Sequence, residues 1–270
     1  MASENYEIVG RHYSTFRQPD PRIARAIHAE LDGIDSIVNI GAGTGSYEPL
    51  DKLVAAVEPS DTMIAQRIVR DNTKIYRAFA ENLPFESSSF DAALAILTIH
   101  HWNNWQKGLQ EALRVAKFKV VLFTWVGMPK GFWLFDYFPE IEHIDKALFP
   151  SVEQLSTVLG NVDVKTVPIP AGCKDGFMCA YWARPENYLN SRVRSTISTF
   201  SRIGDVEEGV KKLAKDIESG EWQNKYGYLQ DFSELDFGYR LIVSNKNAYQ
   251  GARSDSSYVA LRFRRTALTL

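Results

Sequence analysis

Five short apolar runs, separated by polar or helix-like segments, restrict the fold of this chain more than any other feature. Near-continuous apolar strands of this kind suit a parallel sheet that is buried on both faces. The alternation of strands with helical segments predicts an α/β fold with a doubly wound, mostly parallel sheet. The five runs are residues 36–40, 52–58, 74–79, 90–97 and 118–125.

Helix signals lie before and between these runs. Asp20 and Pro21 form an N-cap and first-turn pair ahead of a stretch with helical periodicity. Residues 60–71 and 104–116 are also predicted to be helical. Only about a dozen residues, Pro49 among them, connect the first two strands, which leaves room for one or two helical turns.

The pattern changes after residue 125. An aromatic, irregular segment precedes a predicted helix over residues 151–160, which begins with Ser151 as N-cap and stops at Gly160. Residues 162–170 and 176–183 are predicted as the last two of seven strands, the final one antiparallel.

The chain is therefore expected to have three parts. Residues 1–183 form the α/β domain, which binds the ligand. Residues 184–245 form a helical extension that packs near the active site, with a break at Gly204-Asp205 and a short further element over 236–244. Residues 246–270 form a tail with no core face, which is predicted to be poorly ordered.

Composition and charge exclude several classes of protein. The formal net charge is -2, whereas nucleic-acid binding calls for a basic surplus. No apolar run approaches the ~18 residues of a membrane span, and the N-terminus lacks the apolar core of a secretory signal. Two cysteines, Cys173 and Cys179, fit a reducing compartment and no zinc site. We expect a cytoplasmic protein with no nucleic-acid partner and no metal.

A glycine-rich loop follows the first strand. Gly41, Gly43 and Gly45 stand at every second position, and glycine is favoured where backbone must approach a ligand. Open α/β sheets bind ligands at this carboxyl edge. Glu58 ends the next strand, 17 residues after Gly41, where a carboxylate can accept both hydroxyls of a ribose. The alternative without function is a tight turn beside a surface glutamate.

The loop does not fit a dinucleotide. The fingerprint G-x-G-x-x-G requires glycine where this chain has Ser46 or, in the other frame, Glu48. The short, proline-interrupted helix also offers a poor N-terminus for a pyrophosphate. A nucleoside without phosphate is the better expectation.

Three segments in this order resemble the class I S-adenosylmethionine-dependent methyltransferases. They are "VNIGAGTG" (38–45), "VEPSDTMIAQ" (57–66) and "AENLPFESSSFDAALAILTIHHW" (80–102). Within that class, residues 6–125 are similar to the small-molecule group that includes ubiquinone and menaquinone methyltransferases. The resemblance implies S-adenosylmethionine as cofactor and S-adenosylhomocysteine as product.

The resemblance also implies roles for individual residues. Tyr13 and Arg17, in the N-terminal segment, would close over the site, and Leu97 would lie at the end of the fourth strand. The other residues, ordered from the methionine part of the cofactor through the ribose to the adenine, are Gly41, Ala42, Gly43, Glu58, Pro59, Ser60, Met63, Ala80 and Glu81.

One departure from the family lies inside this site. The family usually has an acidic residue where this chain has Asn39. An amide can still accept a hydrogen bond, but it brings no charge to the ammonium group of the cofactor. The contact of Asn39 with the cofactor is therefore in question.

Three residues are candidates for catalysis. His100 and His101 follow the fourth strand, and a histidine there can act as a general base; alternatively both pack with Trp102. Asp175 is expected near the acceptor pocket, where it would orient or deprotonate a substrate. Alternatively, Asp175 belongs to an Asp-Gly turn with no function.

The sequence thus predicts transfer of a methyl group to a small-molecule acceptor by in-line displacement, in a monomer or homodimer. Alignment supplies much of the rate of such a step, and a base is needed only if the acceptor loses a proton. One alternative is a methyltransferase-like cofactor-binding protein that acts through a partner. Another is an NAD-dependent oxidoreductase, against which Ser46 argues.

Overall fold

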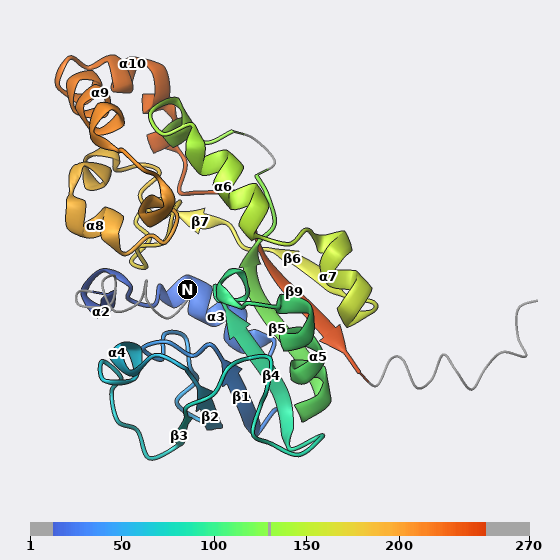
Figure 1. Cartoon of the computed structure of the whole chain (residues 1–270). Helices are drawn as coiled ribbons and strands as arrows, with labels where there is room; N and C mark the ends of the chain where they lie inside the picture. The colour runs from blue at the N-terminus through green and yellow to red at the C-terminus, as the bar shows by residue number, and fades with distance from the viewer. Residues whose placement is uncertain (1–12, 129–130, 247–270) are drawn as a thin grey trace, which may run out of the picture.

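The computed structural model describes residues 13–128 and 131–246, so the predicted tail lies outside the described residues apart from Lys246. Seven strands form one sheet in the order β3-β2-β1-β4-β5-β9-β6 (Figure 1). The strands are β1 (Ser36–Ile40), β2 (Leu53–Val57), β3 (Thr73–Tyr76), β4 (Phe90–Ile96), β5 (Ala116–Trp125), β6 (Asp163–Thr166) and β9 (Tyr239–Asn245).

The direction of the strands confirms the predicted fold class. Strands β1 to β5 pair in parallel, and β9 pairs antiparallel with both β5 and β6. The last strand along the chain is therefore the antiparallel one, and β6 again runs parallel to β5. A separate two-stranded sheet joins β7 (Ile169–Pro170) to β8 (Glu234–Leu235).

The prediction of a strand over residues 176–183 is wrong. This segment forms consecutive turns, in which the Ala180 N–H donates to Phe177 and the Arg184 N–H donates to Tyr181. Its backbone groups are thus paired locally, and an apolar run without periodicity does not distinguish a buried turn from a buried strand. The antiparallel position belongs to β9, which lies within the segment predicted as a helical extension.

The helices match the predicted pattern only in part. They are α2 (Tyr13–Phe16), α3 (Pro21–Ala29), α4 (Asp61–Ile64), α5 (Trp105–Val115), α6 (Glu140–Leu148), α7 (Val152–Leu159), α8 (Ser191–Ser195), α9 (Glu207–Glu218) and α10 (Glu221–Tyr226). Residues 140–148 are helical although that segment was predicted to be irregular, and residues 41–52 form turns where one or two helical turns were expected. Asp20 caps α3, and Ser151 forms a capping box with Gln154 at α7. The helix expected over residues 60–71 is shorter than predicted and ends at Ile64, because the chain turns there and directs Arg67 back to the glycine loop.

Both faces of the sheet are covered, as a doubly wound fold requires. Along β5, Val121 and Phe123 pack in the core that includes α3, whereas Val120 and Leu122 pack in the core that includes α5 and α7. This alternation follows from the two-residue period of a strand. Each fully buried side chain of this size contributes about 1.5–3 kcal/mol to folding.

Part of the C-terminal half lies beyond the carboxyl ends of the central strands, whereas α7, β6 and β9 belong to the layers of the main sheet. Helices α6, α8, α9 and α10 gather beyond these strand ends, at the top of Figure 1. Among residues 13–128 and 131–246, no helix combines the length and the apolar character needed to cross a membrane.

Candidate functional site

A deep cleft opens at the carboxyl edge of the sheet, between the ends of β1, β2 and β4 and the helix α2. It encloses about 1010 Å³ of free space including its mouth. All of the predicted cofactor-binding residues line this one cleft: Tyr13, Arg17, Asn39, Gly41, Ala42, Gly43, Glu58, Pro59, Ser60, Met63, Ala80, Glu81 and Leu97. Their individual roles in binding stay predictions.

The glycine loop has backbone that other residues rarely adopt. Gly41, Gly43 and Gly45 have φ angles of 67°, 51° and 88°, in the left-handed region that favours glycine. A Cβ atom on Gly41 would lie 2.0 Å from the Thr98 Oγ1 atom. The loop therefore turns tightly against the end of β4 and leaves backbone, not side chains, facing the cleft.

Glu58 ties the first two strand ends together. Its Oε2 atom accepts from the Gly43 N–H at 2.8 Å, and its Oε1 atom accepts from the Ser60 N–H at 2.9 Å. Burial raises the pKa of Glu58, although both hydrogen bonds oppose this shift. Each oxygen keeps a further lone pair, so the carboxylate fits the two hydroxyls of a ribose.

Asn39 carries an unpaired acceptor into the cleft. Its Nδ2 atom donates to Glu48 Oε1 at 2.8 Å, and Arg67 binds both oxygens of the same carboxylate at 2.6 and 2.8 Å. The Asn39 Oδ1 atom is buried and has no partner among the described residues. An unpaired buried acceptor costs about 1–3 kcal/mol, and the ammonium group of S-adenosylmethionine would satisfy it.

The cleft also contains residues that were not predicted to bind the cofactor. Phe79 precedes the predicted residues Ala80 and Glu81 in the sequence, and Trp102 follows the predicted residue His101. Their position next to these motifs could have indicated that they line the cleft. The Trp102 Nε1 atom is buried and has no hydrogen-bond partner in the described part of the chain. The full additional set is Thr44, Ser46, Tyr47, Phe79, Ile96, Thr98, Trp102 and Asn103.

An ion pair joins Arg17, the residue after α2, to Asp175, and the two residues also form an isolated β-bridge. Arg17 Nε lies 2.6 Å from Asp175 Oδ1, and the Tyr47 hydroxyl donates to Asp175 Oδ2 at 2.9 Å. The Gly176 N–H also donates to the Phe16 carbonyl at 2.9 Å. Both oxygens of Asp175 are thus engaged. These contacts favour a role in holding Arg17 and Tyr47 at the cleft; the role of Asp175 as a base stays a prediction.

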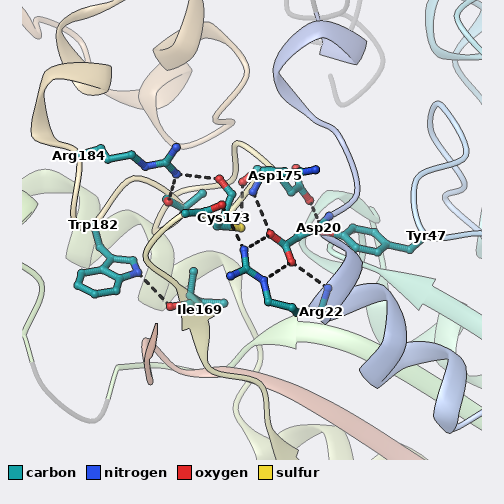
Figure 2. A network of polar contacts seen from close by, with 11 residues as sticks. Asp20, Arg22, Tyr47, Ile169, Cys173, Asp175, Trp182 and Arg184 are labelled. Atoms are coloured by element: carbon teal, nitrogen blue, oxygen red, sulfur yellow. Dashed lines mark hydrogen bonds and ion pairs between the residues drawn. The ribbon is translucent and has the colours of Figure 1, made fainter. Parts of the chain in front are cut away.

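Figure 2 shows the network of polar contacts that surrounds Asp175 and Asp20. Asp20 binds the Arg22 side chain and accepts from the Lys174 N–H at 3.1 Å. Burial opposes ionisation of Asp20, but the bonds from Arg22 and Lys174 prevail and lower its pKa to about 2. Burial raises the pKa of Cys173 to about 12, so Cys173 is a protonated, unreactive thiol.

A second cavity adjoins the cleft, with about 620 Å³ of free space including its mouth. Tyr13, Arg17, Leu97 and His101 line both spaces. Leu97 has a φ of 48°, a strained conformation of the kind that concentrates at functional sites. The remaining walls are His100, Trp125, Asp145, Phe149, Phe177, Met178, Cys179, residues 196–199 and Tyr239.

His100 and His101 lie at this second cavity. The His100 ring stacks on Phe149 with 4.1 Å between ring centroids, and its buried Nδ1 atom has no hydrogen-bond partner among the described residues. Loss of solvation and nearby cationic charge lower the pKa of His101 to about 3 and that of His100 well below its usual value. Both rings are therefore neutral near pH 7 and weak as bases; their catalytic role stays a prediction.

Within residues 13–128 and 131–246, no group of three or more histidine, cysteine or acidic side chains is placed to hold a metal ion.

The fold and the cleft define a Rossmann-like methyltransferase. Residues 38–124 match the family model described as "Methyltransferase domain". The chain is 35% identical to a candidate methyltransferase from an antibiotic biosynthesis pathway of Anabaena variabilis, known from its crystal structure. The two structures match with a TM-score of 0.80 over 85% of this chain and 98% of that one. The chain therefore belongs to the class I S-adenosylmethionine-dependent methyltransferases, and S-adenosylmethionine is its cofactor.

Curated relatives are more distant. A tRNA (carboxymethyluridine(34)-5-O)-methyltransferase of Xenopus tropicalis and a 2-methyl-6-phytyl-1,4-hydroquinone methyltransferase of rice are each 27% identical over 44% of this chain. The matched segments make up only 20% and 37% of those proteins. A phosphoethanolamine-type N-methyltransferase of Haemonchus contortus, solved with S-adenosylhomocysteine, shares the fold at a TM-score of 0.56 and 14% identity.

Proposed function

We propose that this enzyme methylates a small molecule that binds in the second cavity. The observation that carries the proposal is the junction of the two spaces at Leu97 and His101, both of which line cleft and cavity. A ligand in the cavity would meet the cofactor cleft at the end of β4, beyond the glycine loop.

The bound cofactor supplies a methyl group on a cationic sulfur, which an in-line nucleophile can displace. In this chain, Glu58 would hold the ribose and Asn39 Oδ1 would accept from the ammonium group. Arg17 and Tyr13 would cover the cleft, since the ion pair to Asp175 holds them there. The aromatic walls of the cavity would exclude water and align the acceptor, and aromatic faces also attract a cationic centre.

The acceptor is expected to be small because the second cavity lies among buried side chains. Phe177 and Tyr239 are 4% exposed, and Trp125 is likewise 4% exposed. A nicotinamide oxidoreductase is not favoured, because Ser46 breaks the dinucleotide fingerprint. A cofactor-binding protein that acts only through a partner is not favoured either, because this chain itself has a second cavity that adjoins the cofactor cleft.

Methyl transfer from radiolabelled S-adenosylmethionine would test this function. The protein would be incubated with small-molecule, protein and RNA fractions of a cell extract, and the label would be followed in each. We expect label only in the small-molecule fraction. Label in protein or RNA alone, or binding of S-adenosylhomocysteine without transfer to any fraction, would contradict the proposal.

A further inference from the structure

The second cavity contains one buried carboxylate that the methyl-transfer site described above does not use. Asp145 lies on α6 and is 3% exposed. Its Oδ1 atom accepts from the Thr199 hydroxyl at 2.6 Å. Unlike Asp175, Asp145 forms no ion pair with any described residue.

The other ionisable side chains that line the cavity and could carry a charge near pH 7 are already paired or neutral. Arg17 is paired with Asp175, and low pKa values keep His100 and His101 neutral near pH 7. The field of Arg202 reaches Asp145 and lowers its pKa, but burial is the larger effect and raises that pKa to about 6. Asp145 is therefore mostly ionised at pH 7 and is the remaining negative charge at the cavity wall.

Aromatic rings complete the surroundings of this carboxylate. Phe149, Trp125, Phe177 and Tyr239 line the same cavity. Aromatic faces attract cations, and a buried charge is ordinarily paired. An amine on an otherwise apolar or aromatic molecule would supply the missing charge and fill the aromatic space.

From this arrangement we infer that Asp145 is the specificity-determining residue of the acceptor cavity, which takes a small aromatic or apolar molecule bearing a cationic amine. This inference rests on the proposed function, because the cavity is taken as the acceptor site. The amine forms an ion pair with the free Asp145 oxygen, while the Thr199 hydroxyl holds the other oxygen. The rest of the acceptor molecule packs against the aromatic walls of the cavity and extends toward Leu97.

Binding of matched probe pairs to the full-length protein would test the inference. Calorimetry with saturating S-adenosylhomocysteine would compare 2-phenylethylamine with 2-phenylethanol, and tryptamine with tryptophol. We expect at least one amine to bind roughly thirtyfold more tightly than its alcohol. Because this comparison uses the wild-type protein, it does not depend on the folding of any variant.

Two variants on α6 test whether the preference for the amine depends on Asp145. Asp145→Asn keeps an oxygen for the Thr199 hydroxyl but removes the charge, and it should abolish the preference for the amine. Glu142→Gln removes an exposed carboxylate from the same helix, and it should keep the preference. The inference is overturned if neither amine is preferred over its alcohol, or if Asp145→Asn retains the preference. Failure of S-adenosylhomocysteine to bind the wild-type protein would instead contradict the proposed function.

Discussion

The Asn39 side chain is oriented by its neighbour Glu48. The amide nitrogen donates to the Glu48 carboxylate at 2.8 Å, which leaves the amide oxygen as the group without a partner among the described residues. Arg67 holds Glu48 from the other side. The family usually has an acidic residue at the position of Asn39. Here the acidic charge lies on Glu48, is balanced by Arg67, and reaches the cleft only through an amide.

Restoring the family's acidic residue should therefore harm this protein. Asn39→Asp places two carboxylates in hydrogen-bond contact and removes the donor between them, so we expect a loss of about 1–3 kcal/mol in the free energy of unfolding. Affinity for S-adenosylhomocysteine should fall as well. Chemical denaturation and calorimetry would measure the two effects.

The double variant Asn39→Asp/Glu48→Gln is the matched control, because the introduced glutamine can donate to the introduced aspartate and the repulsion disappears. Because Glu48→Gln also removes the charge that Arg67 binds, the double variant is compared with Glu48→Gln alone. Adding Asn39→Asp to Glu48→Gln should cost less stability than adding it to the wild type. A single Asn39→Asp variant that is as stable as the wild type and binds more tightly would show that Glu48 does not set the polarity of this position.

Glu58→Gln tests the ribose contact. Glutamine keeps one acceptor oxygen, but its amide nitrogen faces a backbone N–H that Glu58 now binds. We expect S-adenosylhomocysteine to bind roughly tenfold to a hundredfold more weakly, about 1.5–3 kcal/mol for a hydrogen bond to a charged group. The exposed Glu86→Gln variant should bind normally. Equal affinities of the two variants would contradict the assigned role.

Gly43→Val separates backbone strain from cofactor contact when it is compared with Gly33→Val. Both glycines have positive φ, 51° and 72°, so both substitutions strain the backbone. A Cβ atom on Gly43 lies 3.3 Å from Met63 in the cleft, whereas a Cβ atom on Gly33 meets nothing within 4 Å. We expect both variants to lose stability, but only Gly43→Val to lose cofactor binding in calorimetry. Normal binding by Gly43→Val would show that the loop does not contact the cofactor.

The cofactor cleft was predictable because its residues follow strand ends. The glycine loop, Glu58 and Leu97 each come directly after an apolar run, and parallel strands bring such positions to one edge. The second cavity was not predictable in this way. Asp145 meets Thr199 across 54 positions of the sequence, and only tertiary packing brings them together. A weak signal existed, since Asp145 falls four residues after the buried Ile141 on the apolar face of α6.

Which segment forms the antiparallel strand could not be predicted from the sequence either. Residues 176–183 and 239–245 are both short apolar segments, and local pattern favours the first. The structure uses the second, with Leu241 and Ile242 directed to opposite faces of the sheet. The first segment is held instead by local turns and by the bond from Gly176 to Phe16. The choice depends on these long-range contacts, which composition does not encode.

Asp175→Asn distinguishes a positioning role from a role as general base. Removal of one partner from a buried ion pair typically costs about 3–5 kcal/mol, so we expect a large loss of stability and weaker binding of S-adenosylhomocysteine. The shape of the pH profile for methyl transfer should stay unchanged, because Asp175 takes no proton. Asp61→Asn is the control, since its pair with Arg77 is exposed and is worth about 0–1 kcal/mol. Loss of a titration from the pH profile of Asp175→Asn would instead identify it as a base.

His101 should make the protein sensitive to acid. Its pKa is about 3 in the folded protein and about 6.5 in an unfolded chain, so between these values the unfolded state binds the extra proton. Stability is therefore complete above pH 6.5 and falls as the pH drops toward 3, by about 1.4 kcal/mol per pH unit. His101→Gln should remove about 2 kcal/mol of the wild-type loss between pH 7.5 and pH 5.

Urea unfolding at the two pH values would measure this difference. Asp145 acts in the opposite direction, because its raised pKa makes its contribution to stability increase as the pH falls below 6. That contribution is common to wild type and variant, so it cancels in the comparison. His143→Gln alters an exposed histidine on α6 and should leave the acid loss nearly unchanged. If His101→Gln lost as much stability as the wild type, the ring of His101 would not be held neutral by the protein around it.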